Sequence, residues 1–165
     1  MDRDRFAAIS CSVARTAGLI GDPWTLLVLR DMFLGLSRYE DLHRDLGVAT
    51  NVLADRLDRL VAGGLATRQA YQQRPVRHEY LLTPSGRDLY GVVVAMLAWG
   101  DRHLAADGPP MTLVHATCGH PTAPKVTCAR CGGELTHDTV GTRPGPGGSA
   151  GPGTALIGKL LGGTR

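Results

Sequence analysis

No run of the sequence is long and apolar enough to cross a membrane. A membrane helix needs about 20 consecutive apolar residues, and no stretch approaches that length. The first residues, from Met1 to Arg5, alternate acids with arginines, which does not fit a secretory signal peptide. We therefore expect a cytoplasmic protein with no membrane partner.

Side-chain sets that enzymes commonly use are also missing. The sequence contains no recognisable Ser/His/Asp set, no paired carboxylates and no glycine-rich phosphate loop. Cys128 and Cys131 form a Cys-x-x-Cys pair, but no strand-helix-strand pattern of the thioredoxin kind surrounds them. We therefore expect that the protein is not an enzyme.

Lysine is scarce, since 16 of the 18 basic residues are arginine. Arginine suits bidentate contacts with phosphate and guanine, although a GC-rich gene would give the same bias. Residues 1–108 carry 13 arginines and 13 acids, whereas residues 109–165 carry five basic residues and two acids. The excess charge lies in the tail, so a DNA-binding face in the first part must concentrate its positive charge locally.

Residues 48–64 predict an amphipathic helix. Leu53, Leu57 and Leu60 recur at helical spacing, and Gly63-Gly64 end the helix. Thr50 is expected to cap its start. The opposite face presents polar or small side chains, as a recognition helix in the major groove would: Asn51, Ala54, Asp55, Asp58 and Arg59.

A β-hairpin is predicted to follow this helix. Residues 65–71 have the two-residue alternation that is typical of a β-strand, and residues 79–82 form the second strand. Residues 72–77, which include Pro75, form the turn between them. From Arg68 to His78 there are three arginines and no acid. Such a basic tip suits a phosphate backbone or a minor groove, and it also suits a hairpin whose charges serve only solubility.

The ordered set of motifs resembles the HxlR-type winged helix-turn-helix transcriptional regulators, relatives of the MarR-like group. The resemblance implies a mainly α fold with a small β-hairpin, which dimerises through its N- and C-terminal helices and binds double-stranded DNA. A homodimer would then meet a pseudo-palindromic operator. The matching pieces are Cys11-Ser12-Val13, Leu19-Ile20-Gly21, residues 24–30, Tyr39-Glu40-Asp41-Leu42, residues 53–57, Gly64-Leu65, Glu79-Tyr80, Leu82-Thr83 and Gly86.

Four regions follow from this reading. Residues 1–10 form an N-terminal arm, and residues 11–109 form the winged helix-turn-helix domain. Residues 110–140 are a small Cys/His-rich segment. Residues 141–165 form a Gly/Pro-rich tail that we expect to be disordered, because it has too little to bury.

The helices before the recognition helix carry their own start signals. Asp22 is expected to cap a helix that begins at Pro23, and Trp24 is expected to lie in the core. Ser37 and Glu40 have the spacing of a capping box at the first helix of the helix-turn-helix.

The last long helix is predicted from residue 84 to residue 105. It carries two apolar stripes, more than one small domain can cover, which favours a homodimer interface built with the N-terminal helix. The stripes are Leu89, Val93, Met96 and Gly100, and Tyr90, Val94, Leu97 and Leu104.

The DNA-contacting residues are predicted partly from the helix and hairpin and partly from the resemblance. Arg56 has two readings, since it could contact phosphate or pair with Glu40 or Asp41 and stiffen the fold. The Asp55 carboxylate would repel phosphate, although it could accept a hydrogen bond from the amine of a cytosine. The full set is Arg38, Tyr39, Thr50, Asn51, Ala54, Asp55, Arg56, Arg59, Arg74 and Arg77.

Cys11 matches a position at which several relatives sense electrophiles or oxidants. It is expected near a helix N-terminus, where the helix dipole favours the thiolate. The alternative is a small buried apolar residue. If Cys11 is reactive, its modification is one signal that could control the protein, and a small-molecule effector is another.

The tail contains two turns of the zinc-knuckle kind. His115-x-x-Cys118-Gly119 and Cys128-x-x-Cys131-Gly132 each place two ligand-type residues before a glycine. Together they predict a Zn²⁺ site of His115, Cys118, Cys128 and Cys131, with His120 as an alternative fourth ligand. A redox Cys-x-x-Cys pair and unmetallated cysteines remain alternatives.

Two functions compete on this basis. The first is a dimeric, sequence-specific DNA-binding transcriptional regulator. The second is a winged-helix scaffold without an operator, whose zinc-binding tail recruits other proteins.

Overall fold

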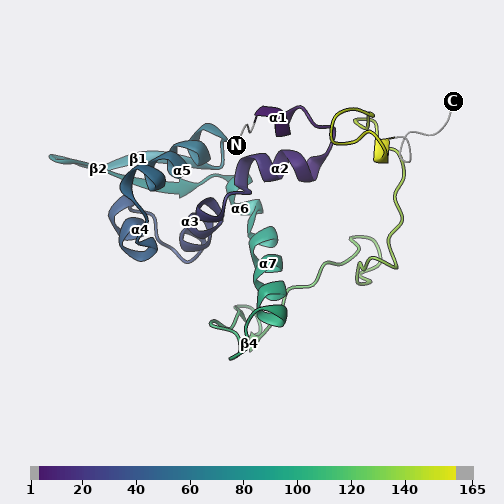
Figure 1. The fold of residues 1–165 in the computed structure, drawn as a ribbon. Helices are drawn as coiled ribbons and strands as arrows, with labels where there is room; N and C mark the ends of the chain where they lie inside the picture. The colour runs from purple at the N-terminus through teal and green to yellow at the C-terminus, as the bar shows by residue number, and fades with distance from the viewer. Residues whose placement is uncertain (1–3, 159–165) are drawn as a thin grey trace.

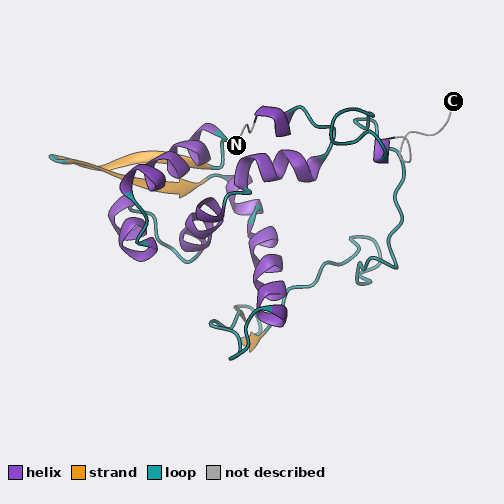
Figure 2. Ribbon diagram, in the orientation of Figure 1, coloured by secondary structure: helices purple, strands orange, loops and turns teal. Residues whose placement is uncertain are grey.

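The computed structural model describes residues 4–158 and consists of a winged-helix body, a projecting helix and a long tail (Figure 1). Residues 1–3 of the predicted arm and residues 159–165 of the predicted tail lie outside the described residues. Helices make up most of the body, and a hairpin extends from it (Figure 2). The elements are α1 (Asp4–Ala7), α2 (Ser12–Ile20), α3 (Pro23–Phe33), α4 (Tyr39–Leu46), α5 (Thr50–Ala62), β1 (Ala66–Gln73), β2 (Val76–Leu82), α6 (Pro84–Asp88), α7 (Tyr90–His103), β3 (Val114–His115) and β4 (His120–Pro121).

Helix α3 lies at the centre of the body and contacts α2, α4, α5 and α7. Its predicted start is confirmed, because the Asp22 carboxylate accepts hydrogen bonds from the amides of Trp24 and Thr25, and Pro23 is the first helical residue. Val28 and Leu29 are fully buried. The prediction for Trp24 was wrong, since this side chain is 37% exposed.

The leucine stripe of α5 completes this core, as predicted. Leu53, Leu57 and Leu60 are buried, and Leu42 of α4 joins the same cluster. Burying one such side chain fully contributes about 1.5–3 kcal/mol, so the stripe fixes α5 firmly against α3. The polar face of α5 must then point outward.

Both predicted caps of the helix-turn-helix were wrong. Ser37 does not cap α4, because its hydroxyl donates to Glu79 of the hairpin, and the N-cap residue is Arg38. Helix α5 begins at Thr50, after an N-cap at Ala49 that supplies no side-chain hydrogen bond. The turn between the helices is at Gly47, whose φ of 59° is the left-handed conformation that glycine favours.

The hairpin is longer, and its turn shorter, than predicted. β1 and β2 pair antiparallel from Ala66–Leu82 to Gln73–Val76, with a register shift between Ala70 and Gln72. Only Arg74 and Pro75 are left at the tip, so the predicted six-residue turn is instead mostly strand. Arg38 forms an isolated antiparallel β-bridge with Glu79 of β2, so one residue before α4 pairs with the hairpin.

The predicted last helix is divided at Leu89 into α6 and α7. Thr83 caps α6 as expected, since its hydroxyl accepts from the amide of Gly86. A Cβ on Gly86 would lie 2.0 Å from the carbonyl oxygen of Leu65, so only glycine allows α6 to approach the residue before β1 this closely. Helix α7 then projects from the body (Figure 1), and none of its residues is buried.

The described part of the Gly/Pro-rich tail returns to the N-terminal helices, which differs from the expected disorder. The Ser10 hydroxyl donates to the carbonyl of Gly147 and accepts from the amide of Ser149. Thr154 is buried. None of the helices between residues 4 and 158 is long and apolar enough to span a bilayer.

Candidate nucleic-acid interface

The N-terminal end of α5 is open to solvent. Thr50 and Asn51 are exposed, whereas Ala54, one turn later, is half-buried. In a helix-turn-helix protein the first residues of the second helix contact base edges. The structure therefore brings the polar start of α5 to the surface where a major groove would have to lie.

Arg56 is held by carboxylates of its own chain. Its Nε donates to Oδ1 of Asp22 at 2.7 Å, and Nη1 bonds to Asp55. The Arg56 side chain is 17% exposed. The predicted partners Glu40 and Asp41 were wrong, because Arg56 turns toward the start of α3 rather than toward α4. This geometry favours a stiffening role for Arg56 over a phosphate contact.

Both acids on the outward side of α5 are paired with arginines. Asp55 also pairs with Arg59, one turn later on the same helix, at 2.7 Å. Asp58 lies 3.7 Å from Arg68 of β1. Pairing reduces the repulsion that these carboxylates would otherwise exert on phosphate, so they do not oppose DNA binding as strongly as the sequence suggests.

Glu40 of α4 connects the helix-turn-helix to the hairpin. Its Oε2 accepts a hydrogen bond from the Tyr71 hydroxyl at 3.3 Å, and its Oε1 lies 3.7 Å from Nε of Arg77. The Arg38 guanidinium lies 4.7 Å from the centroid of the Tyr71 ring. These contacts position two of the predicted cations, Arg38 and Arg77, beside each other on one face.

Tyr39 sets the position of α5 relative to α4. Its hydroxyl donates to the carbonyl of Thr50 at 3.0 Å, and its ring stacks on His43. Tyr39 was predicted as a DNA contact. In the structure its hydroxyl contacts the backbone of Thr50, the first residue of the recognition helix.

Arg74 lies at the exposed tip of the hairpin. Within residues 4–158, no carboxylate lies within ion-pair distance of Arg74, in contrast to Arg68 and Arg77. A cation at the tip of a hairpin can reach phosphates beyond those that α5 contacts.

Sequence reasoning missed the roles of Glu40 and Tyr71. Glu40 was assigned to a local cap because its spacing from Ser37 fits one. The available signal was an aromatic residue, Tyr71, among the polar residues of β1; in the structure its side chain is half-buried.

Cys11 is the N-cap residue of α2 and is half-buried. Its backbone N–H donates to the carbonyl of Ile9. Ser10, the preceding residue, carries the contact with residues 147 and 149 of the tail. The predicted redox residue therefore lies where the tail, α1 and α2 meet.

The four predicted zinc ligands lie in two separate pairs. Nδ1 of His115 is 3.4 Å from Sγ of Cys118. Backbone amides of Cys131 and Arg130, and then the Cys131 thiol, lower the pKa of the Cys128 thiol. Among the described residues, no three His, Cys, Asp or Glu side chains are grouped as ligands of one ion, so the pairs are not assembled into the predicted set.

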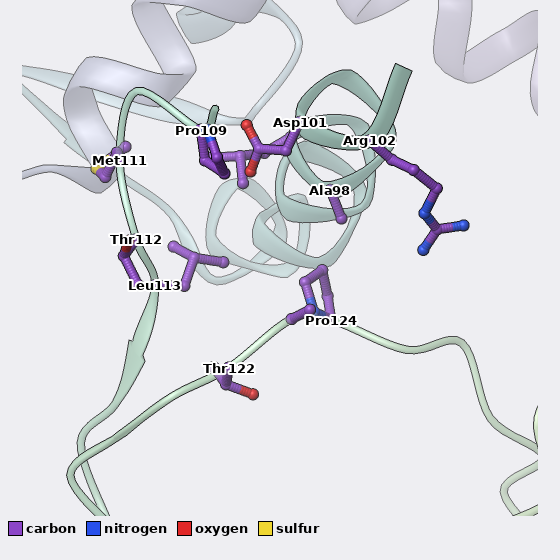
Figure 3. A pocket seen from close by; sticks show the side chains of 11 residues that line it. Ala98, Asp101, Arg102, Pro109, Met111, Thr112, Leu113, Thr122 and Pro124 are labelled. Atoms are coloured by element: carbon purple, nitrogen blue, oxygen red, sulfur yellow. The ribbon is translucent and has the colours of Figure 1, made fainter. Parts of the chain in front are cut away.

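A cavity of about 330 Å³ lies between the end of α7 and the first part of the tail. Leu113, Thr122 and Pro124 of the tail line one side, and Ala98 and Asp101 of α7 line the other (Figure 3). Arg102 also lines the cavity, although its guanidinium points away from the other labelled side chains (Figure 3). The cavity is mostly apolar and falls in the size range of small-molecule sites.

Comparison with known proteins identifies the family. Residues 19–107 match the model of the HxlR-like helix-turn-helix family. A Mycobacterium tuberculosis protein named as an uncharacterised HTH-type transcriptional regulator is 45% identical over 137 residues, which cover 82% of this chain and 87% of that protein.

Solved structures agree with this match. The crystal structure of PA1607, described as a transcription factor, superposes with a TM-score of 0.75 at 34% identity and covers 84% of this chain and 97% of that one. The oxidised form of the redox regulator HypR gives a TM-score of 0.52 at 32% identity, over 56% of this chain and 97% of that one. The chain belongs to the HxlR-like helix-turn-helix family of winged-helix transcriptional regulators.

Proposed function

We propose that this protein regulates transcription by binding an operator as a homodimer, and that it does so in the cytoplasm without enzymatic activity. The observation that carries the DNA-binding part is the exposed start of α5, together with three arginines of the α4 and hairpin region. Arg38 and Arg77 lie on the α4 side, and Arg74 lies at the hairpin tip. Helix α5 would enter the major groove while the hairpin follows the backbone.

The dimer is supported by two helices that bury almost nothing in the single chain. Helix α2 buries only Ile20, and α7 buries no residue. On α7, Trp99 is 58% exposed, and Leu104, which follows its last residue, is 75% exposed. A groove of about 420 Å³ between α3 and α7 is lined by apolar side chains such as Leu27, Met96 and Leu97. Exposed apolar side chains gathered on one helix and beside a groove mark an interaction surface, and a second copy would cover them.

The dimer helices also offer two routes for a signal. Cys11 is the N-cap residue of α2, and the similarity to a protein named as a redox regulator favours thiol oxidation as one signal. The cavity between α7 and the tail favours a small apolar effector. Either event would change the position of α2 or α7 and therefore the spacing of the two α5 helices. This spacing has to match the spacing of the two operator half-sites.

A salt series of binding to the DNA upstream of the protein's own gene tests the operator. We expect tight binding that weakens with salt, and loss of it in Arg74→Glu/Arg77→Glu. The matched control is Lys125→Glu/Arg143→Glu, which makes the same charge change in the tail and should bind as the wild type does. Equal, weak binding by all three proteins would reject the operator and favour a scaffold that recruits proteins.

The same assay tests the redox signal. Oxidant should release wild-type protein from the DNA, and Cys11→Ser should stay bound. Release of both proteins to the same extent would place the sensing group elsewhere.

A further inference from the structure

Two turns in the tail share one backbone geometry. In the first, the amides of Cys118 and Gly119 donate to the carbonyl of His115, and Gly119 has a φ of 69°. In the second, the amide of Gly132 donates to the carbonyl of Cys128, and Gly132 has a φ of 72°. Each turn thus places its two ligand-type residues three positions apart, before a glycine in the left-handed conformation.

Each turn also closes a short hairpin. β3 and β4 flank the first turn, with His115 opposite His120. Around the second turn, Thr127 bridges Glu134, and the amide of Cys128 donates to the carbonyl of Gly133. Two hairpins that present ligands from their turns are a common framework of structural zinc sites.

The two side chains of the first turn already face each other. For a tetrahedral ion with Zn–S near 2.3 Å and Zn–N near 2.1 Å, the edge between the two ligand atoms is about 3.6 Å. The measured separation of His115 Nδ1 and Cys118 Sγ is 3.4 Å, close to this edge.

We propose that His115, Cys118, Cys128 and Cys131 bind one Zn²⁺ ion that draws the two turns together. The two turns lie apart along the tail (Figure 1), so residues 119–127 would have to rearrange to bring the four side chains to one ion. Three thiolates and one imidazole are the soft and borderline donors that zinc prefers over magnesium or calcium.

The first hairpin supplies an anchor for this closure. Leu113, Thr122 and Pro124 pack beside Ala98 of α7 around the cavity of Figure 3. Metal binding would therefore hold the second turn near the end of α7. This inference does not depend on the operator proposal, because it concerns only the tail.

The test uses the full-length reduced chain titrated with Co²⁺ and then with Zn²⁺. We expect one ion per chain, with thiolate-to-Co²⁺ charge-transfer bands and the strong d–d absorption of a tetrahedral site, both displaced by Zn²⁺. Single replacements His115→Ala, Cys118→Ser, Cys128→Ser and Cys131→Ser should each weaken affinity by at least about 100-fold, since even second-shell losses cost 10–100-fold. Circular dichroism of each variant checks that the winged-helix body stays folded.

Matched controls make the result specific. Cys11→Ser and His137→Ala change the same residue types outside the proposed set and should bind metal as the wild type does. His120→Ala should also bind normally, whereas loss of binding there with retention in His115→Ala would overturn the assigned ligand set. Absence of tight binding, or binding that needs only Cys128 and Cys131, would overturn the proposal and favour a redox dithiol.

Discussion

Arg56 of the recognition helix donates to the same Asp22 oxygen that caps α3. The Nε of Arg56 lies 2.7 Å from Oδ1 of Asp22, and this oxygen also accepts from the amides of Trp24 and Thr25. The Asp22 carboxylate therefore caps the central helix α3 and also holds the Arg56 side chain of α5 against the start of α3. The two side chains are 17% and 19% exposed, so solvent screens their attraction only in part.

Replacing Arg56 should reduce stability more than replacing Arg59. We expect Arg56→Met to lower the free energy of unfolding by about 1–2 kcal/mol, because a largely buried charged hydrogen bond is lost. Arg59→Met should cost less than about 0.5 kcal/mol, because its pair with Asp55 is an exposed pair on one helix. Urea unfolding measures both. Equal losses would contradict the structural role of the contact with Asp22.

Gly86→Ala should destabilise the protein strongly. The new methyl would overlap the Leu65 carbonyl at 2.0 Å and force α6 away from β1. We expect the free energy of unfolding to fall by about 3 kcal/mol, at the upper end of overpacking effects. Gly91→Ala is the control, because no described atom outside its own helix lies within 4 Å of the added Cβ. That variant should be unchanged or more stable by up to about 1 kcal/mol.

Asp31 should make stability depend on pH in the acidic range. It is 1% exposed, its Oδ2 has no hydrogen-bond partner among residues 4–158, and burial raises its pKa despite the nearby Arg30. The folded state therefore binds this proton more readily than the unfolded state. The Asp31 contribution to stability should increase as pH falls through the raised pKa, and decrease as pH rises through it.

The variant Asp31→Asn isolates this effect because it cannot titrate. The stability of wild type minus that of Asp31→Asn should increase as pH is lowered from neutral toward about 4, the ordinary aspartate pKa. Urea unfolding of both proteins across that range gives the difference. A difference that stays constant, or that falls with decreasing pH, would contradict the assignment.

Trp99→Glu should disrupt the proposed homodimer. A charge on the exposed apolar side of α7 would have to be buried against the second copy. We expect the dimer dissociation constant to rise by at least about 100-fold, as it does when a central aromatic residue of an interface is lost. Sedimentation equilibrium measures the constant. Val126→Glu places the same charge on an exposed apolar residue of the tail, and it should leave the dimer intact.

Local patterns predicted the parts of the fold that local physics determines. The leucine stripe of α5, the Asp22 cap and the glycine-ended turns depend on residues within a few positions of each other, so their spacing was enough. Trp24 was misplaced because α3 is apolar nearly all round, and periodicity does not indicate which side of such a helix remains uncovered.

The contacts that shape the candidate interface could not be predicted, because they join distant residues. Glu40 binds Tyr71 and Arg77, 31 and 37 positions later, rather than the cap that Ser37 suggested. Arg56 binds Asp22, 34 positions earlier. Long-range ion pairs leave no periodic signal, so the sequence pointed to these candidate cations but not to the side chains that hold them.

The short turn of the hairpin affects how much DNA each protomer would cover. An eight-residue strand that runs to a two-residue tip extends about 26 Å at 3.3 Å per residue. That length equals about seven or eight base pairs of B-DNA. If the hairpin follows the backbone as proposed, the nuclease footprint should extend beyond the pseudo-palindrome on both sides, and the flanking base pairs should affect affinity through their shape without being read directly.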